Sequence, residues 1–314
     1  MSENNGFDLS YNGEETIEKQ QGFELGGSDN KEPQGIYEPR NSGLTIEEEK
    51  DPNKIHVVIS DPSPIVIMFG PGQSGKTMTL VRLTRWLKQN GYKVEPDRTF
   101  RPSNSTTYQE MCDSFHENVN SNYAAKRTKQ LNFMLIKVMN KYGEPICQIL
   151  EAPGEHYFDE DHPKRDFPLY INNILPLPNP KTWMFIVESN WKDASDRQNY
   201  ADKIKEMQSR ISFKDRVIFT CHKADIQTSL FDRGVPNVKQ FFKNIYHQYP
   251  GIFTKYENRN PISRLWRKYN FDFVVFSAGF FNDTIEGGKS YAQSNDMYPA
   301  NLWKAIIKTV KGGW

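Results

Sequence analysis

The residues with the clearest chemical potential form one run, Gly70-Pro71-Gly72-Gln73-Ser74-Gly75-Lys76-Thr77. Its glycines allow a tight turn, so the backbone N–H groups between Gly72 and Lys76 can surround a dense anion. Lys76 would place a point charge between the outer phosphates of a triphosphate, and the Thr77 hydroxyl is a ligand for Mg²⁺. The pattern G-x-x-x-x-G-K-[ST] therefore predicts a nucleotide-binding loop, to which Gly70, Gln73, Ser74 and Gly75 also belong. We call residues 70–77 the glycine loop.

A carboxylate follows an apolar run further along the chain, in Ile149-Leu150-Glu151-Ala152-Pro153-Gly154. Mg²⁺ bound to a threonine hydroxyl also needs a carboxylate, direct or through water, at the end of a neighbouring strand. Glu151 is our candidate for that role, beside Thr77. The alternative is an ordinary surface carboxylate at the end of a strand.

Two further loops follow apolar runs, and the first carries a carboxylate that could recognise a base. The first, His222-Lys223-Ala224-Asp225, comes after residues 217–221, and the second, Ser277-Ala278-Gly279, comes after residues 274–276. A fixed carboxylate at Asp225 can accept hydrogen bonds from N1–H and N2–H₂ of guanine, and adenine presents no such pair of donors. The stem of Lys223 can pack over the base. The alternative for the first loop is a charged loop with no ligand.

Apolar runs and helical periodicities alternate from about Ile55 onward. We expect strands at residues 65–69, 133–140, 145–150, 183–187, 217–221 and 271–276, the second and third forming a hairpin. We expect helices at residues 76–90, 107–118, 196–211, 238–249 and 302–310. Thr107 and Glu110 have the spacing of a capping box, and the helix at 196–211 is expected to be exposed.

This alternation predicts an α/β fold of three layers, with a mostly parallel sheet covered on both faces and one antiparallel edge strand. Long connections are expected at residues 92–130, 156–181 and 278–297. Such connections often carry function.

The glycine loop and the three later motifs occur in the order found in the Ras-like superfamily of P-loop GTPases, which the chain resembles over about residues 62–311. The carboxylate motif resembles D-x-x-G, residues 222–225 resemble the guanine-binding N-K-x-D loop, and residues 277–279 resemble the S-A-K loop. We call residues 222–225 the first base loop and residues 277–279 the second base loop. The chain departs from these patterns with Glu151 for Asp, His222 for Asn and Gly279 for Lys.

The resemblance implies a P-loop NTPase fold and Mg²⁺-dependent binding and hydrolysis of GTP. It assigns Gly154 to sensing the γ-phosphate and Glu151 to Mg²⁺. It assigns the residues His222, Lys223, Asp225, Ser277 and Ala278 to guanine recognition.

The resemblance also implies a threonine that closes onto Mg²⁺ and the γ-phosphate. Thr128, 23 residues before Glu151, is our candidate. The family often orients the attacking water with a Gln after the sensing glycine, where this chain has Glu155 followed by His156. Some related translational GTPases have His there. Lys76, Thr128, Glu155 and His156 are therefore our candidate catalytic residues, and a polar switch segment without a catalytic group is the alternative.

Residues 1–54 are polar and acidic, and we expect them to form a disordered arm before a GTPase domain at residues 55–314. Residues 1–55 hold 13 acidic and 5 basic side chains, which leaves a net charge of +9 on the rest. No apolar run is long enough to span a membrane, and no secretory signal or nucleic-acid groove is recognisable. The three cysteines are isolated, so we expect a cytoplasmic protein with reduced thiols.

Three functions remain open at this stage. The first is a GTP-hydrolysing switch that recruits a protein effector or activator in its GTP state. The second is a nucleotide-binding scaffold without effective hydrolysis. The third is an ATP-specific P-loop phosphohydrolase or a small-molecule kinase.

Overall fold

The computed structural model describes residues 51–120, 133–191, 193–266, 268–283 and 289–312. Seven strands form one sheet in the order β2-β3-β4-β1-β5-β6-β9. Their bounds are β1 Ile65–Phe69, β2 Lys93–Pro96, β3 Met134–Met139, β4 Pro145–Glu151, β5 Lys181–Glu188, β6 Arg216–His222 and β9 Asp272–Val275. The six strands predicted from hydrophobic runs are all present, and β2 is an addition.

The sheet is mostly parallel, as predicted. β1 pairs in parallel with both β4 and β5, and β5–β6–β9 continues in the same direction. β3 is antiparallel to both of its neighbours, β4 and β2. The predicted hairpin therefore supplies the antiparallel strand, but β2 adds to its outer side and occupies the edge.

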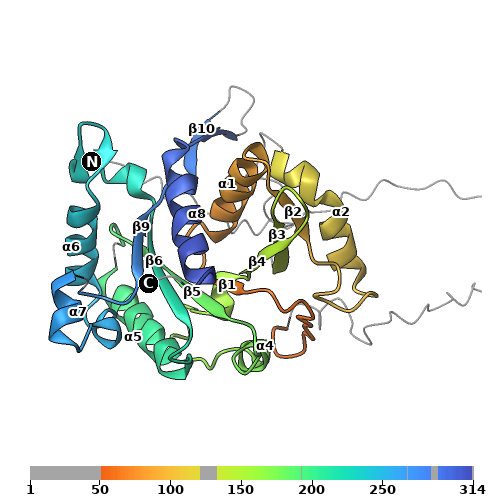
Figure 1. The fold of residues 1–314 in the computed structure, drawn as a ribbon, viewed down its shortest axis with the longest axis horizontal. Helices are drawn as coiled ribbons and strands as arrows, with labels where there is room; N and C mark the ends of the chain where they lie inside the picture. Colours follow the sequence, from red (N-terminus) through yellow and green to blue (C-terminus); the bar gives the residue numbers. More distant parts are fainter. Residues whose placement is uncertain (1–50, 121–132, 192, 267, 284–288, 313–314) are drawn as a thin grey trace, which may run out of the picture.

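Helices cover both faces of this sheet, which gives three layers (Figure 1). The helices are α1 Lys76–Gln89, α2 Thr106–Asn120, α4 Leu169–Ile174, α5 Ala194–Arg210, α6 Val238–Gln248, α7 Pro261–Trp266 and α8 Met297–Val310. In Figure 1, α1 and α8 lie on one face, and α4 and α5 lie on the other. The fold class predicted from the sequence is thus confirmed.

Two local predictions about helices were wrong. The helix predicted at 196–211 is not simply exposed, because α5 buries Tyr200, Ile204 and Met207 along one stripe. Helix α2 begins at Thr106, and the Ser105 Oγ accepts a hydrogen bond from the Tyr108 backbone N at 3.4 Å. Thr107 therefore lies inside the helix. Ser105 takes the capping role that the sequence had suggested for Thr107.

Two short hairpins also lie outside the predicted elements. β7 (Phe231–Asp232) pairs with β8 (Val235–Pro236), and β10 (Gly279–Asp283) pairs with β11 (Lys289–Gln293). The two strands β10 and β11 occupy half of the connection predicted at 278–297. β10 begins at Gly279, the last residue of the Ser277-Ala278-Gly279 loop, which places the hairpin beside the candidate site.

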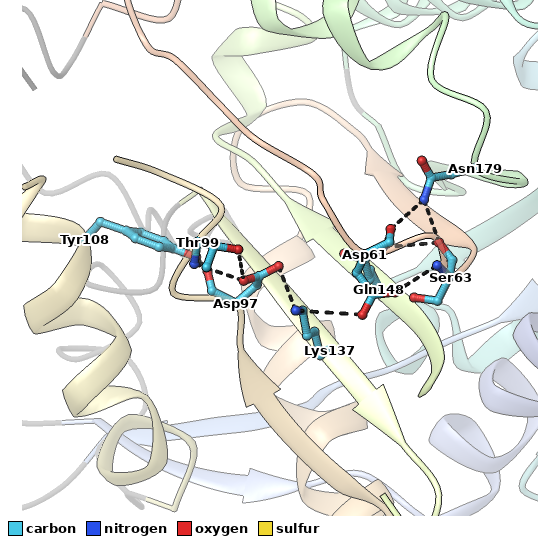
Figure 2. Close-up of polar contacts among 8 residues, drawn as sticks. All are labelled: Asp61, Ser63, Asp97, Thr99, Tyr108, Lys137, Gln148 and Asn179. Carbon is cyan, nitrogen blue, oxygen red and sulfur yellow. Dashed lines mark hydrogen bonds and ion pairs between the residues drawn. The ribbon is translucent and has the colours of Figure 1, made fainter. Parts of the chain in front are cut away.

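The segment before β1 is tied to the sheet by a polar network, shown in Figure 2. The side-chain amides of Gln148 and Asn179 each donate to the backbone carbonyls of Asp61 and Ser63, over 2.8–3.1 Å. On the other side, the Lys137 ammonium lies 3.2 Å from the buried Asp97 carboxylate and 3.7 Å from that of Asp61. These contacts hold the segment in place at the start of β1, whose far end carries the glycine loop.

No helix in the described parts of the chain is long and apolar enough to cross a membrane.

Candidate nucleotide site

The predicted site residues meet at one edge of the sheet. β1, β4, β5, β6 and β9 run in the same direction, so their carboxyl ends lie along the same edge. The glycine loop follows β1, Glu151 and His222 end β4 and β6, and the second base loop begins after β9. In open α/β sheets, ligands bind at this edge, where the strand order reverses direction.

The glycine loop has the backbone of an anion-binding turn. Gln73 and Gly75 have positive φ angles of 56° and 84°, separated by Ser74. Such alternation turns successive N–H groups toward the same concave space, and α1 begins immediately afterwards at Lys76. Left-handed conformation is costly for Gln73, and a ligand that uses its N–H group would account for keeping it there.

Lys76 is buried inside this loop. Its Nζ donates to the carbonyls of Gly70 at 2.9 Å and Pro71 at 2.7 Å, which directs the ammonium across the loop. Burial lowers the pKa of Lys76 to about 8, while the nearby carboxylates of Glu151, Glu155 and Glu188 favour its charged form. An added polyanion would favour the charged form further.

Thr77 and Glu151 are in direct contact. The Thr77 hydroxyl donates to Glu151 Oε1 at 2.9 Å, and the backbone N–H of Phe133 donates to Oε2 at 3.2 Å. Glu151 is only 1% exposed, and its burial raises the pKa of its carboxyl group. A hydroxyl and a buried carboxylate are ligands that suit Mg²⁺.

Within the described residues, no group of three or more His, Cys, Asp or Glu side chains could hold a metal ion alone. A cation at Thr77 and Glu151 would therefore take its other ligands from phosphate and water, as Mg²⁺ commonly does. The donor set fits a metal that arrives with a nucleotide.

Gly154 lies directly on the glycine loop. A Cβ added to Gly154 would lie 2.0 Å from Gly72 N and 2.3 Å from Pro71 O. A Cβ added to Gly72 would in turn lie 2.8 Å from Glu155 Oε1. In this conformation Gly154 and Glu155 cover the end of the loop at Pro71–Gly72.

His222 points inward, toward the glycine loop. It is 3% exposed, and its Nδ1 lies 2.9 Å from the carbonyl oxygen of Ser74, so Nδ1 must carry the proton that is donated. Burial lowers the pKa of His222 to about 3, which keeps the ring neutral. His222 thus joins the first base loop to the glycine loop.

The two base loops are joined to each other. The Ala224 backbone N–H donates to the Phe276 carbonyl at 3.2 Å, and the His222 and Phe276 rings lie 5.3 Å apart. Lys223, in left-handed conformation at φ 52°, forms an ion pair with Glu188 at 3.0 Å. This pair fixes the direction of a lysine stem that is otherwise half-exposed.

Two polar side chains of these loops have no hydrogen-bond or ion-pair partner among the described residues. Asp225 is half-buried, and its carboxylate makes no hydrogen bond or ion pair with any residue in the described ranges. The Ser277 hydroxyl is buried and also lacks a hydrogen-bond partner there. A polar ligand at this side of the site could therefore pair with both groups.

His156 lies beside the glycine loop in a different environment. Gly154–His156 form one 3₁₀ turn, and His156 Nδ1 contacts the Tyr170 hydroxyl at 3.0 Å. Burial lowers the pKa of His156 to about 4, with Lys76 acting in the same direction. His156 also lines a cavity of about 820 Å³, together with Arg101 and Phe133.

The structure brings the predicted nucleotide-contact residues of the described chain to the same sheet edge. Thr128 lies outside the described residues. Sequence reasoning missed Glu188, although it ends a strand in the same way as Glu151 does. It also missed the Phe133 backbone N–H that contacts Glu151, because a backbone donor carries no residue-type signal.

No protein-family model and no curated protein matches the chain. Among solved structures, nucleolar GTP-binding protein 1 of Plasmodium falciparum aligns at 12% identity and a TM-score of 0.41, over 82% of this chain and 91% of that one. A structure from the chloroplast translocon components atToc33 and psToc159, which have GTPase activity, aligns at 10% identity and a TM-score of 0.41, over 81% and 85%. The GTP-bound GTPase-like domain of S. cerevisiae Ski7 aligns at 13% identity and a TM-score of 0.39, over 81% of this chain and 51% of that one. These neighbours are GTP-binding proteins or GTPases.

Proposed function

We propose that this chain is a Mg²⁺-dependent protein that binds GTP and GDP and hydrolyses GTP. The observation that carries the proposal is the direct connection between a phosphate half and a base half. His222 joins the first base loop to the Ser74 carbonyl, and Thr77 joins the glycine loop to Glu151. One nucleotide could span this arrangement, with its phosphates at Lys76 and its base at Asp225.

Mg²⁺ is part of this proposal. Thr77 would bind it directly, and Glu151 would bind it directly or through water, as the 2.9 Å contact between them allows. When bound, the cation neutralises charge on the outer phosphates. Glu151 meanwhile holds the Thr77 hydroxyl in position.

Guanine is preferred over adenine because the partnerless groups here are suited to its donors. The Asp225 carboxylate can accept from N1–H and N2–H₂, and the Ala278 backbone N–H is the proposed donor to O6. Lys223, oriented by Glu188, is proposed to pack over the ring. Adenine would leave the Asp225 carboxylate without donors, which is costly in a half-buried site.

Asp225→Asn tests this assignment. Xanthine carries an oxygen where guanine carries the N2 amino group, so an Asn amide can donate to it. We expect the variant to lose at least about tenfold in GDP affinity and to gain affinity for XDP. The comparison is equilibrium titration of both nucleotides on wild type and variant. An unchanged preference would show that Asp225 does not contact the base.

Hydrolysis would involve the segment that covers the glycine loop. A γ-phosphate at Lys76 approaches Gly154 and Glu155, so we propose that these residues move when GTP binds and return after hydrolysis. Glu155 and His156 are the candidates for positioning the attacking water. His156 is neutral near pH 7 because its pKa is about 4, so it can accept a proton.

A non-hydrolysing scaffold is the second candidate, because Glu155 brings negative charge toward the γ-phosphate. Phosphate release in a single turnover, with protein in excess over GTP, separates the two functions. We expect slow but measurable release, which decreases in the double variant Glu155→Ala/His156→Ala. GTP binding with no release would favour the scaffold.

Further proposals concern the rest of the molecule. Thr128 would close onto the metal and the γ-phosphate, as a switch threonine. The acidic segment 1–54 and the domain at 55–314 would act in the cytoplasm, where the GTP-dependent surface recruits a protein effector or activator.

A further inference from the structure

We propose that Arg82 and Ser294 are positioning residues that hold the second base loop, Ser277-Ala278-Gly279, in place for guanine. This inference rests on the proposed function and extends it to residues that no motif includes. Arg82 belongs to α1, which begins at Lys76, and Ser294 follows β11.

Ser294 contacts the second base loop through both its side chain and its backbone. Its hydroxyl donates to the Ser277 carbonyl at 2.6 Å, and its backbone N–H donates to the Ala278 carbonyl at 3.1 Å. The Tyr291 hydroxyl also donates to the Ala278 carbonyl, at 2.5 Å. Three donors therefore fix two consecutive carbonyls, and with them the direction of the neighbouring backbone N–H groups.

Arg82 anchors Ser294 to the phosphate side. Its guanidinium donates to the Ser294 carbonyl at 2.9 Å and to the Ser294 hydroxyl at 3.4 Å, and it forms an ion pair with Asp296. The Arg82 side chain is 1% exposed. Removing a guanidinium from water is costly, and a hydrophobic residue would pack on a helix at lower cost, so this charge has a purpose beyond packing.

The second base loop needs the contacts from Ser294 and Tyr291 because its last residue is Gly279. The resemblance places a lysine at this position, but Gly279 has a φ of 147°, and a Cβ there would lie 2.2 Å from the Ala292 carbonyl oxygen. No side chain fits, so Gly279 cannot stabilise the loop in the way that a lysine could. The returning β11 end supplies the stabilising contacts instead, through Ser294.

Arg82 and Ser294 form a second connection between the proposed phosphate half and base half, in addition to the His222–Ser74 contact. Lys76 and Arg82 lie on the same rigid helix, about 9 Å apart along its axis. Arg82 contacts Ser294, and Ser294 contacts the loop that would meet guanine O6. The His222 contact joins the other base loop to the glycine loop, so each base loop has its own connection to the phosphate half.

The test compares base binding with phosphate binding in the full chain. GDP and ADP are titrated with Mg²⁺, and pyrophosphate is titrated as a probe of the phosphate half alone. Ser294→Ala should weaken GDP binding about five- to tenfold and reduce the preference for GDP over ADP, while pyrophosphate affinity stays within about twofold. Ser294→Thr, which keeps the hydroxyl, should restore GDP affinity, and Ser114→Ala on α2 is the matched control.

Arg82→Lys tests the same positioning role through the other residue. It keeps the charge near Asp296 but loses the forked contacts of the guanidinium to Ser294. It should also weaken GDP more than pyrophosphate. Equal weakening of both ligands, or unchanged GDP binding in both variants, would overturn the positioning role. A wild-type chain that binds neither GDP nor pyrophosphate would instead overturn the proposed function, and the inference with it.

Discussion

Gly154 is the residue whose substitution the structure constrains most directly. In Gly154→Ala the new methyl group would lie within 2.3 Å of backbone atoms of Pro71 and Gly72, so the backbone would have to shift. We expect the free energy of unfolding to fall by about 2 kcal/mol, the typical cost of overpacking, as measured by urea denaturation.

Gly72→Ala is the matched control for that experiment. Its methyl group would meet only the end of the Glu155 side chain, which can rotate away. It should cost less than about 1 kcal/mol. Equal losses in the two variants would contradict the close packing of Gly154 on the glycine loop.

His222 makes stability depend on pH. Its pKa is about 3 in the folded chain against 6.5 as the ordinary value, so below pH 6.5 the unfolded chain binds a proton that the folded chain does not. The contribution of neutral His222 to the free energy of unfolding is therefore fully present above pH 6.5 and is lost as pH falls toward 3. Between these two pH values, His222 alone should change the free energy of unfolding by up to about 1.4 kcal/mol per pH unit.

His222→Asn isolates this effect, since an Asn amide can donate to the Ser74 carbonyl without titrating. His156, with a pKa of about 4, contributes in the same direction and remains in the variant. Chemical denaturation between pH 7.5 and 4.5 should therefore show that the free energy of unfolding falls less steeply with pH in the variant. The difference in slope should correspond to roughly one proton fewer bound on unfolding. Identical slopes would mean that His222 is not buried in its neutral form.

At the scale of elements, the strands and the glycine loop could be predicted because buried parallel strands appear as solid apolar runs. β1 spans residues 65–69, as predicted from Ile65-Val66-Ile67-Met68-Phe69. β2 escaped prediction because its sequence, Lys-Val-Glu-Pro, has a single buried side chain, Val94. Its pairing with β3 depends on tertiary context, which a short polar strand does not reveal.

The same limit explains what was missed in the site. Glycine, lysine and threonine at fixed spacing identify the glycine loop, because their chemistry depends on residue type. The support from Ser294 comes from 17 residues beyond Ser277, after a hairpin that the sequence did not indicate. The contact of His222 with the Ser74 carbonyl was also missed, because its backbone acceptor carries no residue-type signal.

Helix α5 offers a test of burial at this scale. Ile204 is fully buried, and the neighbouring Lys205 is partly exposed and forms an ion pair with Asp202. Ile204→Ala should lower the free energy of unfolding by about 2–4 kcal/mol, whereas Lys205→Ala should change it by less than about 0.5 kcal/mol. Urea denaturation of both variants is the measurement. Similar small losses would support the exposed helix that the sequence alone suggested.

At the scale of the whole molecule, the near-zero net charge of +1 conceals an acidic first segment and a body that carries +9 beyond residue 55. A positive body favours the approach of polyanions such as nucleotides. This attraction is not selective, because it acts on GTP and ATP alike. Selectivity must come from the base loops, and retention of phosphate from Lys76.

Titration calorimetry with Mg·GTP, Mg·GDP and Mg·ATP, on wild type and Lys76→Ala, tests the central claim most directly. We predict that guanine nucleotides bind at least about a hundredfold more tightly than ATP, since a site built for polar groups rejects a base that leaves them unpaired. Lys76→Ala should lose at least about tenfold in affinity for each guanine nucleotide. Equal affinity for GTP and ATP, or unchanged binding by Lys76→Ala, would contradict the account.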